Sequence, residues 1–411
     1  MLKHIVFSAL LTVLFLPSQA FSNEASLEEL FESKSPHDIS LLLGEKYLVS
    51  RIVETEVLAP QALGVRSSLS SDGSSNRDHF ALPKGRHFGS VPGETPMVRF
   101  SLFQRGSEYE LNGAVVLEDG EVMNLEAKNL RKDSRISLRA SHDVQRGVAP
   151  TCAAEKGISN DFLEGFSLSD EQKNSLRMLR SETALIAELA TEADQEYVSR
   201  FGGLTPAFEQ IQAVTNIVSG IFEAHFNVSF RIVFQNGWTS TDPYTSNTAS
   251  TLLSQFSNYW YSHFPDNDTS VYRRTIAQMF TGRTMASGVA GIANTGSLCW
   301  GGEYNIAQNS PNGIGFTATT AAHETGHTFG AYHDTTSGFI MWPVLVAARD
   351  EFSPISITNI DSGIQVGLFL SASSGHVCLL EEEDDSVTLS PPVKVESAGP
   401  AQQTSSYAEH P

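Results

Sequence analysis

The sequence predicts an α/β fold for residues 181–380, with a mostly parallel twisted sheet and long helices, preceded by a small β-rich domain. Three observations lead to this prediction. Apolar strand-like runs alternate with segments of helical period between residues 183 and 280. Apolar and polar residues alternate with a period of two through residues 97–139. Two histidines one helical turn apart, within residues 319–334, add a helix whose face can bind a metal ion.

The composition is that of a globular protein. Of the 411 residues, 40% are hydrophobic and 18% are charged, and this length suggests two domains plus tails. The formal net charge of -20 argues against nucleic acid as a partner, because Lys and Arg must neutralise phosphate. It agrees with a self-repelling exported protein. After the N-terminal segment no run reaches about 18 apolar residues, so no membrane span is expected.

The N-terminus has the pattern of a signal peptide. Lys3 and His4 form a short basic start, and residues 5–16 are apolar but too short to span a membrane. Small residues precede and include Ala20, so we expect residues 1–20 to be removed and the protein to be secreted or periplasmic. A short membrane anchor is the alternative.

Residues 21–150 are predicted to form the β-rich domain. Strand-like runs occur at 47–53 and in three segments between 97 and 127, whereas residues 64–96 are rich in Ser, Gly, Pro and Asn and are predicted to be loop. This part contains no catalytic constellation. Its histidines have no metal-ligand spacing and are expected at the surface: His37, His79, His87 and His142.

In residues 181–380 the predicted elements alternate between strand and helix. This order favours a parallel sheet with right-handed crossovers. The predicted strands and helices are, in order, 183–191, 204–226, 228–234, 249–263 and 272–280, with a last helix at 355–364. From residue 381 to residue 411 the chain is acidic and then poor in apolar residues, which predicts a disordered tail.

The most specific feature is the pattern H-E-x-x-H-x-x-G-x-x-H. His323 and His327 would leave the same face of a helix. Gly330 can end that helix at a positive φ and return His333 as a third ligand. Three protein ligands leave one position for water, as in catalytic zinc sites. Glu324 lies beside them and can serve as general base.

This pattern, with Asp334 after the third histidine, resembles the metzincin metalloproteases, and in particular their adamalysin (reprolysin) branch. Phe-Ile-Met-Trp-Pro at 339–343 resembles the methionine turn of that family, with Met341 beneath the histidines, although a lone Met is ordinarily just core. The resemblance implies a zinc endopeptidase with one catalytic Zn²⁺ held by the three histidines. We expect Asp334 to fix the turn below the site.

The resemblance also implies where a substrate binds. Gly288, Val289, Ala290 and Gly291 correspond to an antiparallel edge strand, to which an extended protein or peptide substrate can add by main-chain bonds. A plain glycine-rich loop is the alternative. Val344 and Leu345 would form the wall of the pocket for the side chain after the scissile bond.

Three cysteines in an exported chain suggest one pair and one remaining thiol. The resemblance implies a disulfide between Cys299 and Cys378. It also makes Cys152 a candidate inhibitory zinc ligand, in a linker at 151–180 that follows a propeptide-like region. A buried or incidental thiol is the alternative. An R-x-x-R pattern ending at Arg180 suggests processing of a zymogen there.

A catalytically silent, protease-like binding module with a retained N-terminal binding domain is the alternative function, and the intact Glu324 argues against it. Calcium capture by the acidic run at 381–385 is chemically possible, but its spacing does not support a site. The sequence leaves the substrate and the oligomeric state open.

Overall fold

The computed structural model describes residues 26–33, 35–43, 46–70, 72–91, 94–118, 120–134, 137–141, 149–153, 184–267, 270–374 and 378–381. The predicted signal peptide, the predicted processing site at Arg180 and the predicted tail beyond residue 381 lie outside these residues. Within them, no helix is both long and apolar enough to cross a membrane.

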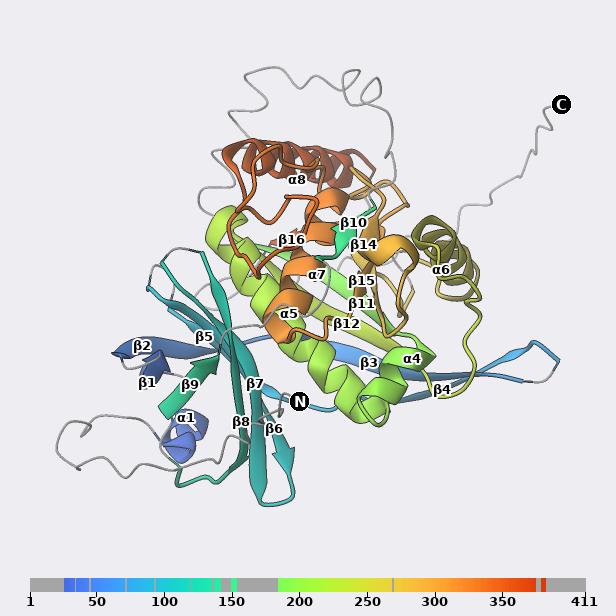
Figure 1. Ribbon diagram of the computed structural model, residues 1–411. Helices are drawn as coiled ribbons and strands as arrows, with labels where there is room; N and C mark the ends of the chain where they lie inside the picture. Colours follow the sequence, from blue (N-terminus) through green and yellow to red (C-terminus); the bar gives the residue numbers. More distant parts are fainter. Residues whose placement is uncertain are drawn as a thin grey trace, which may run out of the picture. The chain divides into compact units, whose positions relative to one another are not determined.

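The N-terminal part contains a closed β-barrel, as the alternating pattern predicts (Figure 1). Its strands are antiparallel neighbours, except that the first and last close the barrel in parallel. They are β1 (His37–Leu43), β2 (Lys46–Thr55), β5 (Arg86–Ser90), β6 (Met97–Arg105), β7 (Glu108–Val116), β8 (Val122–Leu130) and β9 (Ser137–Ser141). The helix α1 (Leu27–Glu32) adds Leu27 and Leu30 to its core, where Phe88, Phe100 and Leu125 also lie.

His87 corrects one expectation, because it is buried in the barrel wall and only 4% exposed. Its Nδ1 lies 2.7 Å from the Ser101 hydroxyl, and its ring meets Phe103 edge-on. Burial lowers the pKa of His87 from 6.5 to about 3. The sequence missed this because a histidine that replaces an apolar residue on the inner face of a strand has no spacing signature.

The buried His87 should make the protein sensitive to acid. Below pH 6.5 the unfolded chain takes up a proton that the folded chain rejects, so stability is lost as the pH falls toward 3. One group loses about 2 kcal/mol between pH 6.5 and 5. We expect His87→Gln to show a shallower loss of unfolding free energy than the wild type, measured by urea titration at pH 7 and 5. His79→Gln, at an exposed position, is the control, and equal slopes for wild type and His87→Gln would contradict this assignment.

The second sheet contains the predicted parallel centre. The strands β12 (Val228–Trp238), β11 (Leu185–Ala193), β13 (Ile276–Thr281) and β15 (Tyr304–Gln308) pair in parallel in this order. The short strand β14 (Val289–Ala293) pairs antiparallel with β15, as the sequence predicts for residues 288–291. The strand β16 (Leu379–Glu381) pairs antiparallel with β11 near its start, so residue 381 belongs to the fold and not to the tail.

Residues 64–96 are not a loop, which corrects the prediction for that segment. The strand β3 (Leu58–Leu69) pairs in parallel with β12, and β4 (Ser75–Ala81) pairs antiparallel with β3, so both extend the second sheet. The serine-rich composition concealed this, since polar residues usually mark loops. Here the buried Ser67 donates a hydrogen bond of 2.7 Å to the Asn236 side chain, so its polarity is satisfied inside the sheet.

Helices cover the faces of this sheet. The helices α5 (Leu204–Phe226) and α6 (Ala249–His263) have the predicted bounds, whereas α8 (Pro354–Ser374) is longer than predicted. The helix α7 (Ile314–Thr328), which carries the histidine pattern, lies beside α5 (Figure 1). Three short elements complete the described fold: β10 (Thr151–Cys152), α4 (Gln195–Arg200) and the 3₁₀ turn η1 (Ala286–Gly288).

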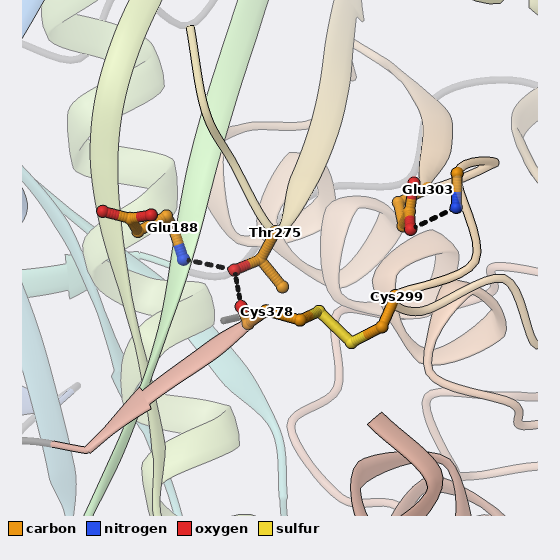
Figure 2. The surroundings of a disulfide bond; sticks show 6 residues. Glu188, Thr275, Cys299, Glu303 and Cys378 are labelled. Carbon is orange, nitrogen blue, oxygen red and sulfur yellow. Dashed lines mark hydrogen bonds between the residues drawn. A yellow bond between two sulfur atoms is a disulfide. The ribbon is translucent and has the colours of Figure 1, made fainter. Parts of the chain in front are cut away.

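The disulfide implied by the resemblance is present between Cys299 and Cys378 (Figure 2). It closes a loop with a sequence separation of 79, which stabilises the fold by about 4 kcal/mol in the chain-entropy account. Thr275 adds to this connection, because its hydroxyl accepts from the Glu188 N–H and donates to the Cys378 carbonyl (Figure 2). The segment after β14 is thereby joined to the end of the fold.

Candidate active site

The three histidines converge on one point. His323 and His327 lie one turn apart on α7, which ends at Thr328. Gly330 then adopts a φ of 110°, a conformation that favours glycine, and the chain returns His333 to the same place. The Nε2 atoms of His327 and His323 lie 3.1 Å apart, and those of His323 and His333 lie 3.3 Å apart.

Backbone carbonyls determine which ring nitrogens carry protons. The Nδ1 of His323 lies 2.6 Å from the Ile340 carbonyl, and the Nδ1 of His327 lies 2.8 Å from the Ala331 carbonyl. Because a carbonyl only accepts, each Nδ1 holds the proton and each Nε2 presents its lone pair. Burial lowers the pKa of His323 to about 4 and that of His327 well below its usual value. Both rings are therefore neutral at pH 7.

This arrangement fits a zinc ion. Two neutral imidazole nitrogens that both present lone pairs at 3.1 Å repel each other unless a cation lies between them. The Cys152 sulfur lies 3.5 Å from the His327 Nε2, and the four possible ligand atoms are all within 4.8 Å of one another. Three imidazoles and one thiolate form a closed tetrahedral zinc set. Within the part of the chain that the structure describes, the three predicted histidine ligands and Cys152 thus form one cluster.

Glu324 lies in the same pocket with both carboxylate oxygens buried, and no N–H or O–H of the described residues donates to them. Burial raises the pKa of Glu324 to about 8, and the neighbouring Cys152 thiol offsets part of the rise. A buried carboxylate that has a weak thiol donor beside it but accepts no N–H or O–H from the described residues is costly for folding alone. It is the environment of a group that exchanges protons with a ligand.

Gly291 on β14 makes room for that carboxylate. A Cβ at this position would lie 2.2 Å from the Glu324 Oε1. We expect Gly291→Ala to push the carboxylate aside and to lower the rate of peptide cleavage by about 10²-fold, since small displacements of catalytic groups have effects of this size. Zinc content should not change, as measured by native mass spectrometry.

Gly302→Ala is the matched control for this variant, because a Cβ there would meet its nearest atom at 3.6 Å and the backbone has no positive φ. An unchanged rate in Gly291→Ala would show that the position of Glu324 is not critical.

Met341 lies where the resemblance implies, fully buried against α7. Its sulfur would be 2.7 Å from a Cβ at Gly326, so the glycine between the two histidines allows this close packing. The Asp334 N–H donates to the Met341 carbonyl at 2.9 Å, and its carboxylate accepts from Ser353 and Ser356 at the start of α8. Asp334 therefore fixes the turn, whereas carbonyl groups are the partners of the two helical histidines.

A segment of the chain itself occupies the cleft between β14 and the predicted pocket wall. We call residues 149–153, which include β10 (Thr151–Cys152), the strap. Its N–H groups at Cys152 and Ala153 donate to the carbonyls of Pro343 (3.0 Å) and Gly291 (3.1 Å). The Leu345 N–H donates to the strap at Pro150 (2.9 Å). The predicted edge strand is thus covered on its outer side.

The predicted substrate residues lie around this strap. Val289 pairs with Thr151 from one side and Val344 bridges it from the other. Ala290 and Leu345 line the small pocket beside Glu324, and Gly288 and Leu345 also line a neighbouring cavity of about 170 Å³. The sequence missed the backbone partners Ile340, Ala331 and Pro343, because a carbonyl group belongs to every residue type and leaves no signal.

A comparison with protein families agrees with this geometry. Residues 185–365 match the family model Reprolysin_5, described as metallo-peptidase family M12. The matched segment begins at β11, ends within α8 and includes all three histidines and Glu324.

Proposed function

Residues 185–365 belong to the reprolysin-type metallopeptidases of family M12, and from this premise we propose that the chain is a secreted, adamalysin-like zinc endopeptidase made as a latent precursor. The observation that carries the proposal is the convergence of three imidazole nitrogens beside the buried Glu324 carboxylate. A structural zinc site does not require a carboxylate beside its ligands, whereas hydrolysis of a peptide bond requires a general base.

His323, His327 and His333 would hold the zinc ion. When bound, zinc acidifies a water molecule and polarises the substrate carbonyl. Glu324 takes the proton of the attacking water and delivers it to the departing amine nitrogen. Burial raises the pKa of Glu324 in the metal-free, strap-bound site, and a nearby zinc cation would favour its ionised form, which is the form that accepts a proton. The Nδ1 hydrogen bonds to Ile340 and Ala331 hold the imidazoles in the orientation and tautomer that these steps need.

An extended peptide would bind along the groups that now hold the strap. The Gly291 carbonyl on one side and the Pro343 carbonyl and Leu345 N–H on the other can bond to a substrate backbone. Val289, Ala290, Met285 and Leu345 supply apolar lining to the adjacent cavity of about 170 Å³. This lining favours an aliphatic or aromatic side chain next to the scissile bond.

Latency is proposed from the strap. Cys152 supplies a sulfur atom at the fourth ligand position, and the strap backbone uses both walls of the cleft. While it is bound, neither water nor substrate can reach the site. Secretion is proposed from the predicted signal peptide and agrees with the disulfide, since such bonds persist in oxidising compartments.

Metal removal tests the proposed function. The purified protein, freed of the strap by proteolysis, should contain one zinc per chain and cleave an unfolded protein such as reduced casein. A chelator should abolish cleavage, and stoichiometric Zn²⁺ should restore it. Zinc-loaded protein that binds unfolded chains without cleaving them would instead support a silent binding module.

A further inference from the structure

The helix α5 carries buried polar side chains that find their partners in the β-barrel. Asn216 is fully buried, and its amide donates to the carbonyls of Phe88 (3.2 Å) and Phe100 (3.0 Å). It also accepts from the Thr55 hydroxyl at 3.0 Å. An isolated catalytic domain would leave this amide facing an exposed barrel-binding surface. Asn216 therefore depends on the barrel for these hydrogen bonds of its side chain.

Two ion pairs connect the same surfaces. Arg105 of β6 binds both oxygens of the buried Glu209 on α5. Arg99, also of β6, is buried and pairs with Glu223 of α5. Losing Arg105 would leave the buried Glu209 carboxylate without its partner, and losing the barrel would leave α5 without both arginines, which is unfavourable above all at Glu209.

Glycines on both sides admit the Arg99 side chain. A Cβ at Gly89 of β5 would lie 2.7 Å from Arg99, and one at Gly220 of α5 would lie 2.5 Å from it. A side chain at either glycine would clash with Arg99, so the barrel and α5 both leave space for its guanidinium.

The hairpin of β3 and β4 makes the sheet itself continuous between the two parts. The strand β3 pairs with β12 from Leu58 to Ser67, and the Phe80 ring stacks on Phe208 of α5. A single core cluster includes Val57 and Leu82 together with residues of α5, α7 and α8. Removing this hairpin would expose one full edge of β12 and a side of the core.

The barrel also supports the helix that carries the histidines. The N-cap of α7 is Gly313, which has no side chain to cap the helix. Asn124 of β8 accepts a hydrogen bond of 2.9 Å from the Gly315 N–H in the first turn. This acceptor satisfies one of the free N–H groups that every helix start presents.

We propose that residues 26–141 are a permanent subunit of the active enzyme. When the chain is cut on both sides of the strap, this N-terminal part stays bound to α5, β12 and α7, and activation removes only the strap. The strap is a segment of five residues held by backbone bonds to the two walls of the cleft and by its sulfur, whereas the barrel and hairpin share a sheet, a core and two ion pairs with the catalytic part. The inference concerns the composition of the enzyme and goes beyond the proposed function.

A site-specific cut tests it. A recognition sequence for a selective protease is placed within residues 160–175 of the full chain, and the protein is cut without denaturant. Size exclusion and native mass spectrometry should find both fragments in one 1:1 particle. A second recognition sequence within residues 142–148 should then release the strap, with the barrel fragment still bound and peptidase activity increased. A C-terminal fragment that elutes alone, folded by circular dichroism, would overturn the proposal.

Variants separate the barrel interface from the zinc site. Cys152→Ser should leave the cut particle intact, because its stability does not depend on the sulfur. Arg105→Glu places a negative charge against Glu209 and should raise the dissociation constant of the fragments at least tenfold. The exposed Arg51→Glu, on the barrel strand β2, is the charge-matched control. Equal dissociation constants for these two variants would show that the interface is not formed as described.

The two proposals fail in different ways. An intact two-fragment particle that does not cleave casein would contradict the proposal of an endopeptidase and support the proposal of a permanent subunit. Cleavage by a lone C-terminal fragment would do the reverse.

Discussion

Glu324→Gln should lower kcat/KM for peptide cleavage by 10²–10⁴-fold, the range that a general base contributes. The amide is nearly isosteric with the carboxylate but cannot accept the proton of the attacking water. In strap-free protein the Cys152 thiol no longer lies beside Glu324, and no N–H or O–H of the other described residues donates to its carboxylate, so the substitution removes no strong hydrogen bond of the fold. The measurement is the initial rate on a fluorogenic peptide with strap-free protein.

The zinc content of Glu324→Gln should equal that of the wild type, since the ligands are His323, His327 and His333. Its thermal midpoint should be unchanged or higher, because a buried group that resists ionisation has been replaced by a neutral one. His327→Ala is the contrasting variant and should lose both metal and activity. A rate for Glu324→Gln close to that of the wild type would contradict the assigned role.

Cys152→Ser should change the metal environment of the uncut chain. With Co²⁺ in place of zinc, the wild-type precursor should show the charge-transfer absorption of a sulfur ligand, and the variant should lack it. Activity of the uncut variant should rise from a very low level, but only in part, because the strap still bonds through its backbone to Gly291, Pro343 and Leu345. The absorption spectrum and the rate on a small peptide measure the two effects separately.

Cys152→Ser is compared with Thr151→Ser, which alters the strap without touching the sulfur and should keep both the absorption band and the latency. An identical cobalt spectrum in Cys152→Ser and wild type would show that the sulfur is not a ligand, and the latency would then have to come from the strap backbone alone.

Periodicity located much of the catalytic part. The helices at 204–226 and 249–263 have the predicted bounds, because their apolar stripes repeat every turn over many residues. Strand ends were less well predicted: β13 begins at Ile276 and not at residue 272. The Ser, Gly, Pro and Asn content of residues 64–96 predicts loop, but the pairing of β3 with β12 overrides this composition.

Residue chemistry alone specified the metal-binding site. Two histidines at helical spacing, a glutamate between them, a glycine able to turn the chain and a third histidine are local features, and local geometry dictates where their side chains go. The family resemblance placed Met341 and paired Cys299 with Cys378. The signal peptide, the processing at Arg180 and the acidic tail stay predictions.

The three-dimensional arrangement decided the rest. It showed that the strap lies between Gly291 and Pro343, that Asn124 supports the histidine-bearing helix, and that α5 joins two halves of one molecule. Each of these depends on backbone groups or polar side chains that meet across more than one hundred residues. Contacts of this kind leave no periodicity and no residue-type pattern in the sequence. Their free energy comes from desolvation and hydrogen bonding, which arise only once the distant segments have packed together.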